Sequence, residues 1–233
     1  MLTKIEGRTL QTFFILCLST LVSAAQQGGG RTPLIIPTPQ EVVARGGKFS
    51  ITSDTKILLG SNSSRDQFAA QQINLELARW KYPALAVTDA RAIQHVPTKS
   101  ILIGDIGSEA GRNLLKDRKR AWRPEMTEEG YFLDIDENGI VIIAASDKGR
   151  FYGVMTLLQM MRRVANSAVV DCASLTDFPL YKMRGLSDDI SRGQVSTPDN
   201  FKKIFRFLAR YKMNSYSPYM EDMFSFRNHP LIG

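Results

Sequence analysis

The side chains best suited to chemistry form two charged groups near the end of the 233-residue chain. The first group is Asp188-Asp189 followed by Arg192, and the second is Glu221-Asp222. An arginine next to a carboxylate presents a rigid fork of donors that suits neighbouring hydroxyl groups on a sugar ring. The alternative is that these charges satisfy loop backbone groups and one another. Their spacing alone selects no reaction.

Two predicted strands and one predicted helix must position these groups. Residues 182–189 and 214–219 are predicted strands, and Thr197 with Pro198 marks the start of a helix between them. A strand, a helix and a strand with polar residues at the strand ends are how a (β/α)₈ barrel begins. Side chains alternate along a strand, so one carboxylate of each pair should face the barrel mouth. A closed barrel takes about 250 residues, so residues 178–233 are expected to be an incomplete barrel start.

Residues 34–177 are predicted to form a separate mixed α/β domain. Helices are expected from residue 65 to Pro83 with Ser64 as N-cap, over 109–117, and over 147–163. The Asn138-Gly139 pair favours a tight hairpin. The fold class is therefore α/β (α+β), a mixed sheet followed by the incomplete barrel. Strands are predicted at 41–44, 48–51, 56–59, 85–88, 100–104, 130–136 and 140–145.

The first residues have the pattern of a targeting segment. Lys4 and Arg8 precede an apolar run at 13–18, and small residues at 22–25 suit cleavage. We therefore expect a signal peptide at 1–25, a linker at 26–33, and export to a periplasmic or extracellular compartment. No other segment is expected to cross a membrane. Removal of the leader would leave one cysteine, Cys172, which can form no internal disulfide.

The basic composition favours few classes of partner. The formal net charge is +7, and the densest basic run lies at 116–120 with Arg123 just beyond. This run is either a polyanion-binding patch with a weak preference for acidic glycans or a solvated loop. No nucleic-acid motif accompanies it, so no nucleic-acid partner is expected. His95 and His229 lie far apart without a cysteine cluster, so neither a metal site nor a cofactor is expected.

Several short motifs resemble glycoside hydrolase family 20, the β-N-acetylhexosaminidases. The resemblance runs from about Leu34 to the end of the chain, with the motifs in the family's order. The later ones resemble the start of that family's catalytic barrel, and the earlier ones its N-terminal domain. The motifs are IPTPQ at 36–40, GY at 130–131, GRFYGV at 149–154, LLQ at 157–159, RGLSDDISR at 184–192, YKMN at 211–214 and ED at 221–222.

The resemblance implies a zincin-like N-terminal domain without metal, and a glycan substrate ending in N-acetylhexosamine. It implies hydrolysis with retention, in which the substrate's own acetamido oxygen attacks the anomeric carbon. Arg192 matches the arginine that holds the terminal sugar. Asp189, Glu221 and Asp222 are expected to support it without touching the sugar. The family's catalytic Asp-Glu pair follows the fourth strand and has no counterpart in this chain, which is expected to be inactive alone.

Two departures and two alternatives accompany this prediction. The chain has Gly193 and Tyr219 where the family often has histidine. An O-GlcNAcase-like glycosidase is one alternative, because Asn214-Ser215-Tyr216 and Pro218 resemble the second strand of that group. A non-catalytic carbohydrate-binding protein built from the N-terminal domain is the other. Linkage, sugar preference and oligomeric state are left open.

Overall fold

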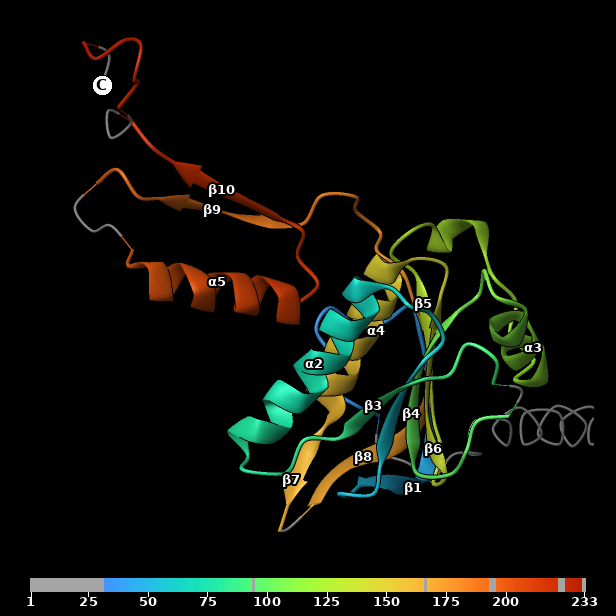
Figure 1. Ribbon diagram of the computed structural model, residues 1–233. Coiled ribbons are helices and arrows are strands. Elements are labelled where there is room, and N and C mark those ends of the chain that lie inside the picture. Colours follow the sequence, from blue (N-terminus) through green and yellow to red (C-terminus); the bar gives the residue numbers. More distant parts are fainter. Residues whose placement is uncertain (1–31, 94, 166, 193–195, 222–224, 232–233) are drawn as a thin grey trace, which may run out of the picture.

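A computed structural model describes residues 32–93, 95–165, 167–192, 196–221 and 225–231. Its largest unit is an eight-stranded mixed sheet in the order β1-β8-β5-β6-β4-β2-β3, with β7 paired to β8 (Figure 1). Strands β2, β3, β4 and β6 pair in parallel, whereas β1, β5 and β7 pair antiparallel with β8. The strands are β1 (Glu41–Ile51), β2 (Lys56–Leu59), β3 (Ala86–Asp89), β4 (Ser100–Asp105), β5 (Tyr131–Ile135), β6 (Gly139–Ala144), β7 (Arg162–Val164) and β8 (Ser167–Asp177).

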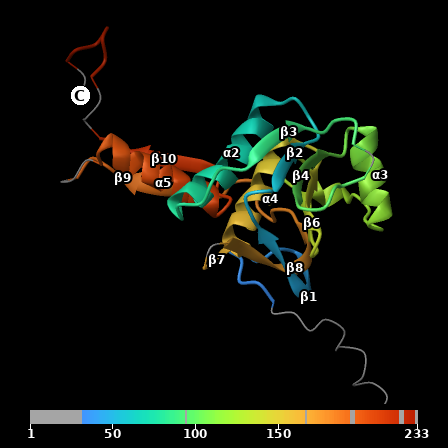
Figure 2. The same cartoon turned by 60° about the horizontal axis from the view of Figure 1, so that its bottom comes forward.

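Helices cover both faces of this sheet. Helices α2 (Ser64–Arg79) and α4 (Asp147–Met160) pack on one face, and α3 (Glu109–Asp117) packs on the other (Figures 1 and 2). A short 3-10 turn, Pro124–Met126, follows α3. The mixed α/β fold class predicted from the sequence is confirmed. No described helix is long and apolar enough to cross a bilayer.

Serine hydroxyls begin the three helices of this domain. Ser108 and Ser146 cap α3 and α4 with their side-chain oxygens. For α2 the prediction of Ser64 as N-cap is wrong by one residue. Ser63 has the extended backbone of an N-cap, and its hydroxyl accepts a hydrogen bond from the Arg65 amide at 3.2 Å. Ser64 is instead the first residue of the helix.

Two predicted boundaries also differ. The strands expected at 41–44 and 48–51 are one strand, β1, whose register against β8 shifts between Ala44 and Lys48. The helix expected over 147–163 ends at Met160, because Met161 turns to extended backbone and the chain continues as β7. Both errors arise where pairing with β8 overrides the local pattern.

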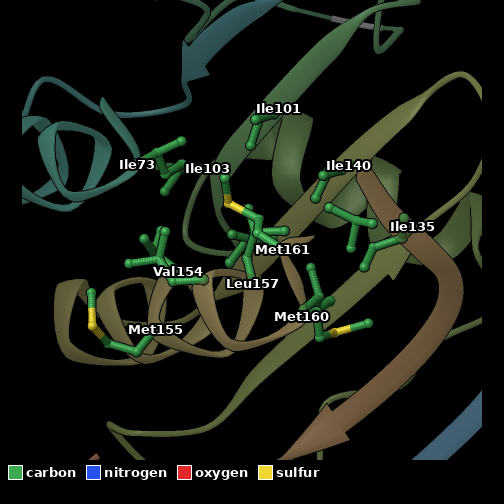
Figure 3. Packing of buried hydrophobic residues seen from close by; sticks show 14 of the residues in the cluster. Ile73, Ile101, Ile103, Ile135, Ile140, Val154, Met155, Leu157, Met160 and Met161 are labelled. Atoms are coloured by element: carbon green, nitrogen blue, oxygen red, sulfur yellow. The ribbon is translucent and has the colours of Figure 1, made fainter. Parts of the chain in front are cut away.

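The main core lies between α2, α4 and the sheet. Ile73 from α2, Leu157 from α4 and Ile103 from β4 are completely buried and lie close together (Figure 3). Methionines fill the irregular space around the end of α4, as expected for a flexible apolar side chain. A smaller cluster lies under α3 and is built from Leu58, Leu102, Leu114, Leu115, Met126, Phe132, Val141 and Ile143.

Gly153 lets α4 approach the sheet closely. A Cβ atom at this position would lie 2.5 Å from Ile142 Cγ2 and 3.3 Å from the Tyr131 ring. We expect Gly153→Val to lower the free energy of unfolding by about 1–3 kcal/mol through overpacking, measured by urea denaturation. Gly46→Ala is the control, since nothing lies within 4 Å of a Cβ there. Equal stability of the two variants would contradict this packing argument.

A second unit projects from the α4 side of the domain (Figure 1). Strands β9 (Gly185–Asp189) and β10 (Ser215–Tyr219) pair in parallel, with α5 (Pro198–Arg210) between them in sequence. Thr197 caps α5, as predicted, by accepting from the Asn200 amide at 3.3 Å. On α5, Leu208 is buried whereas Phe205 is 49% exposed.

Candidate functional site at the ends of β9 and β10

Arg192 and Glu221, one from each charged group predicted from the sequence, meet beyond the carboxyl ends of β9 and β10. Asp189 pairs in register with Tyr219, so both strands end at the same level. The Ile190 amide continues the pairing by donating to the Tyr219 carbonyl at 3.1 Å. Parallel pairing thus brings together two loops that are about thirty residues apart in sequence.

Arg192 and Glu221 form the centre of this site. Arg192 Nη2 lies 2.6 Å from Glu221 Oε1, and the Tyr219 hydroxyl donates to the same oxygen at 3.3 Å. Arg192 is 73% exposed, so most of its guanidinium surface faces solvent. Glu221 therefore contacts the arginine directly. Asp222, the other predicted residue of this group, lies outside the described residues.

Asp189 organises the loop that carries Arg192. Its Oδ1 accepts from the Ser191 hydroxyl at 2.6 Å and from the Ser191 amide at 3.0 Å. Its Oδ2 lies 3.9 Å from Arg192 Nε. The hydrogen bonds from Ser191, with the nearby Arg192 charge, hold the pKa of Asp189 below its usual value. The carboxylate therefore stays ionised and fixes the turn after β9.

The two adjacent aspartates face opposite sides of the sheet, as strand alternation predicts. Asp188 Oδ2 accepts from the Tyr216 hydroxyl at 2.8 Å, and the Tyr216 ring packs on Phe201 and Phe205 of α5. Burial, with this hydrogen bond, raises the pKa of Tyr216. Asp188 thus belongs to the helix side. Asp189 is left on the face that a barrel turns inward.

A buried polar network fixes the base of this unit. Lys212, in the turn between α5 and β10, places Nζ 2.7 Å from Asp177 Oδ2 at the end of β8. The same ammonium lies 3.2 Å from the Tyr131 and Thr156 hydroxyl oxygens. Tyr131 also donates to Asp177 at 2.6 Å. Burial lowers the pKa of Lys212, and the Asp177 charge opposes that shift.

Further hydrogen bonds surround this network. Arg184 Nη2 lies 2.5 Å from Glu129 Oε2, and Asn214 donates to the other oxygen of Glu129 at 3.2 Å. Gln159 on α4 donates to the carbonyls of Ile36 and Arg210 at 2.9 and 2.8 Å. The residues just before β9 and just before β10 are thereby hydrogen-bonded to the N-terminal domain at the same place, next to the start of β5.

A cavity of about 210 Å³ opens beside the network, lined in part by Tyr152, Phe178 and Tyr181. Its charged groups are already paired with one another, as Arg184 with Glu129 and Lys212 with Asp177. Burial raises the pKa of Tyr152. The cavity therefore belongs to the junction between the two units.

Sequence reasoning missed this network, and no local signal pointed to it. Lys212 has φ of 59°, the left-handed region that usually selects glycine or asparagine after a helix. Lys81 and Lys119 adopt similar values after α2 and α3 and are exposed, so a lysine at this position does not by itself indicate a buried side chain. Sequence reasoning also missed Tyr219 and Tyr216 as contacts of the carboxylates. The contact of Tyr216 with Asp188 could have been predicted, because strand alternation places both side chains on the same face of the paired strands.

Comparison with known proteins agrees with these observations. The family model described as glycosyl hydrolase family 20, domain 2, matches residues 32–178, which is more than half of the chain. This chain belongs to glycosyl hydrolase family 20. The predicted family resemblance is confirmed. The matched region ends one residue after β8, next to the Lys212–Asp177 network.

The chain is also similar to named beta-hexosaminidases and spans less than a fifth of the length of the two given below. The chain is 26% identical over 191 residues to a beta-hexosaminidase of Vibrio vulnificus, covering 81% of this chain and 18% of that protein. It is 34% identical over 98 residues to a beta-hexosaminidase of Porphyromonas gingivalis, covering 39% and 12%. A solved exo beta-N-acetylglucosaminidase from Vibrio harveyi, in complex with N-acetylglucosamine, superposes with a TM-score of 0.64. That match covers 88% of this chain and 29% of the solved one at 18% identity, and it shows the shared fold.

Proposed function

We propose that this chain is the N-terminal part of an exported β-N-acetylhexosaminidase that removes terminal N-acetylhexosamine residues from glycans. Family membership and the names of the relatives support the glycosidase activity. The observation that carries the proposal is the exposed Arg192 guanidinium, held by Glu221 where two parallel strands end. Residues 1–25 act as the export signal. Residues 178–233 begin the catalytic barrel.

Arg192 is the sugar-binding residue in this proposal. Its guanidinium keeps open donors on the solvent side, and their planar fork matches two neighbouring ring hydroxyls. Glu221 and Asp189 hold the guanidinium from the protein side, which lowers the entropy lost when a sugar binds. The hydroxyl of Tyr219 fixes Glu221 in turn. Asp222, the next residue in the sequence, is proposed to contribute to the same support.

The proposed reaction is hydrolysis with retention, assisted by the substrate. The acetamido oxygen of the substrate attacks the anomeric carbon while the glycosidic bond breaks, and the leaving oxygen takes a proton from a carboxylic acid. Water then attacks the same carbon, opens the ring that has formed and returns its proton to that carboxylate. In this proposal the proton donor and the carboxylate that stabilises the intermediate come from residues after Gly233. In this proposal the described part of the chain binds the terminal sugar through Arg192. This binding positions the acetamido group for attack on the anomeric carbon.

The proposal is tested on the longer protein in which the chain continues past Gly233. The substrate is a chromogenic N-acetyl-β-glucosaminide. Arg192→Gln is expected to lower kcat/KM by about 10- to 150-fold, the size of one lost charge-assisted hydrogen bond. Arg206→Gln, an exposed change on α5, is the control and should leave kcat/KM unchanged. Proton NMR of the first-formed product should show the β-anomer.

Three outcomes would contradict parts of this proposal. Turnover by the 233-residue chain alone would show that the reacting groups lie within it. A first-formed α-anomer would exclude retention. Equal activity of Arg192→Gln and wild type would remove Arg192 from sugar binding.

A further inference from the structure

The basic run at 116–120 folds back onto the second face of the sheet. Arg120 Nη2 lies 3.3 Å from Asp134 Oδ1 on β5, and Arg118 Nε lies 3.8 Å from Asp134 Oδ2. Asp134 is 10% exposed and also accepts a hydrogen bond from Ser174 on β8. Two arginines of the run, Arg118 and Arg120, are therefore held at one place on the sheet, whereas Lys116 and Lys119 are exposed.

A third arginine reaches the same carboxylate from another element. Arg45 follows the register shift in β1, and its Nη2 lies 3.9 Å from Asp134 Oδ1. The neighbouring carboxylate, Glu41, is engaged by Arg123. Three guanidinium groups thus face one aspartate, which leaves two positive charges in excess. Arg45 is 48% exposed and Arg118 is 24% exposed, so both present donors to solvent.

The cluster is ordered before any ligand binds. Arg120 donates to the hydroxyls of Ser174 and Thr176, and its guanidinium lies 5.8 Å from the centre of the Phe132 ring. Arg118 Nη1 donates to the Leu114 carbonyl at 3.5 Å. Guanidinium groups that are already fixed lose less entropy on binding an anion, and they pair well with planar or tetrahedral oxyanions.

We propose that Arg45, Arg118 and Arg120 form an anion-binding surface for the sulfate or carboxylate groups of an acidic glycan. The choice of a glycan rests on the proposed function, whereas the anion-binding surface rests on the three arginines. The aromatic rings beside them are already packed, since Trp122 meets Phe132 edge to face at 5.9 Å. Phe132 is buried and Trp122 is partly buried against it, so this surface offers guanidinium groups rather than a row of rings for stacking nucleic-acid bases.

Calorimetry on the 233-residue chain at low ionic strength tests this surface with three probes. These are a sulfated heparin oligosaccharide, an unsulfated hyaluronan oligosaccharide and a single-stranded DNA of similar charge. We expect at least one glycan to bind. Arg45→Gln and Arg118→Gln should each weaken that binding about tenfold, the effect of one lost charge-assisted hydrogen bond. The two glycans distinguish a sulfate-specific surface from a general anion-binding one.

Arg79→Gln is the matched control, because Arg79 is an exposed arginine on α2 paired to Glu76. It removes the same charge away from the cluster and should leave glycan binding unchanged. The proposal is overturned if neither glycan binds, if DNA binds as tightly as the glycans, or if Arg79→Gln weakens binding equally. Because no step of this test needs turnover, failure of the proposed hydrolysis would leave its result intact.

Discussion

Replacing Lys212 by methionine is expected to undock the second unit from the N-terminal domain. The change removes the ammonium that lies 2.7 Å from Asp177 and leaves that carboxylate, itself 10% exposed, with the Tyr131 hydroxyl as its remaining donor in this network. Breaking one partner of a buried pair costs about 3–5 kcal/mol. Amide hydrogen exchange should report this loss as protection that falls about 10²- to 10⁴-fold in α5, β9 and β10.

Two further variants separate the effect of the charge from the effect of packing in this experiment. Lys202→Met removes an exposed lysine of α5, paired to Asp199, and should leave exchange unchanged. The double variant Lys212→Met/Asp177→Leu removes both charges, so much of the lost protection should return. If Lys212→Met exchanged its amide hydrogens at the wild-type rate, the network would not hold the two units together.

Replacing Arg150 by methionine is expected to destabilise the N-terminal domain itself. Arg150 Nε lies 2.8 Å from Oδ1 of Asp66, a completely buried carboxylate on α2, and Nη1 lies 3.4 Å from Asp105 at the end of β4. The change leaves Asp66 with the Ser61 hydroxyl as partner. We expect a loss of about 3–5 kcal/mol in the free energy of unfolding, measured by urea denaturation with circular dichroism.

The control for this variant is Arg65→Met on the same helix as Asp66. Arg65 is 74% exposed and pairs with Asp147 at 2.8 Å, so its removal should barely change the midpoint. Lys212→Met should also leave the midpoint of the N-terminal domain in place, because it acts on docking. If Arg150→Met unfolded at the same urea concentration as Arg65→Met, the buried Arg150–Asp66 pair would not stabilise the domain.

Local signals in the sequence were sufficient for much of the fold. Thr197 and Pro198 predict the start of α5, and strands are predicted on both sides of that helix, at 182–189 and 214–219. Because their parallel pairing aligns the strand ends, Arg192 and Glu221 could be predicted to lie near each other. Their part in sugar binding stays a prediction. The adjacent serines at 63 and 64 show the limit of this reasoning, since either could cap α2.

The buried charge pairs could not be predicted in the same way. Lys212 and Asp177 are 35 residues apart, and Arg150 and Asp66 are 84 residues apart. Each pair exists because two elements dock, and docking depends on the shape of whole surfaces rather than on local pattern. The three arginines around Asp134 share this property, because Arg45 reaches them only through the register shift in β1.

The contacts that hold the second unit lie at the amino ends of β9 and β10, whereas Arg192 lies beyond their carboxyl ends. The pair of strands is therefore anchored at its amino ends only. Five residues of strand span about 16 Å, so a small rotation of the strands about Lys212 produces a larger displacement of Arg192 at the other end. A displacement of about 1 Å at such a place can cost about 100-fold in rate. Substitutions at the base should thus act by displacing Arg192, the proposed sugar-binding residue.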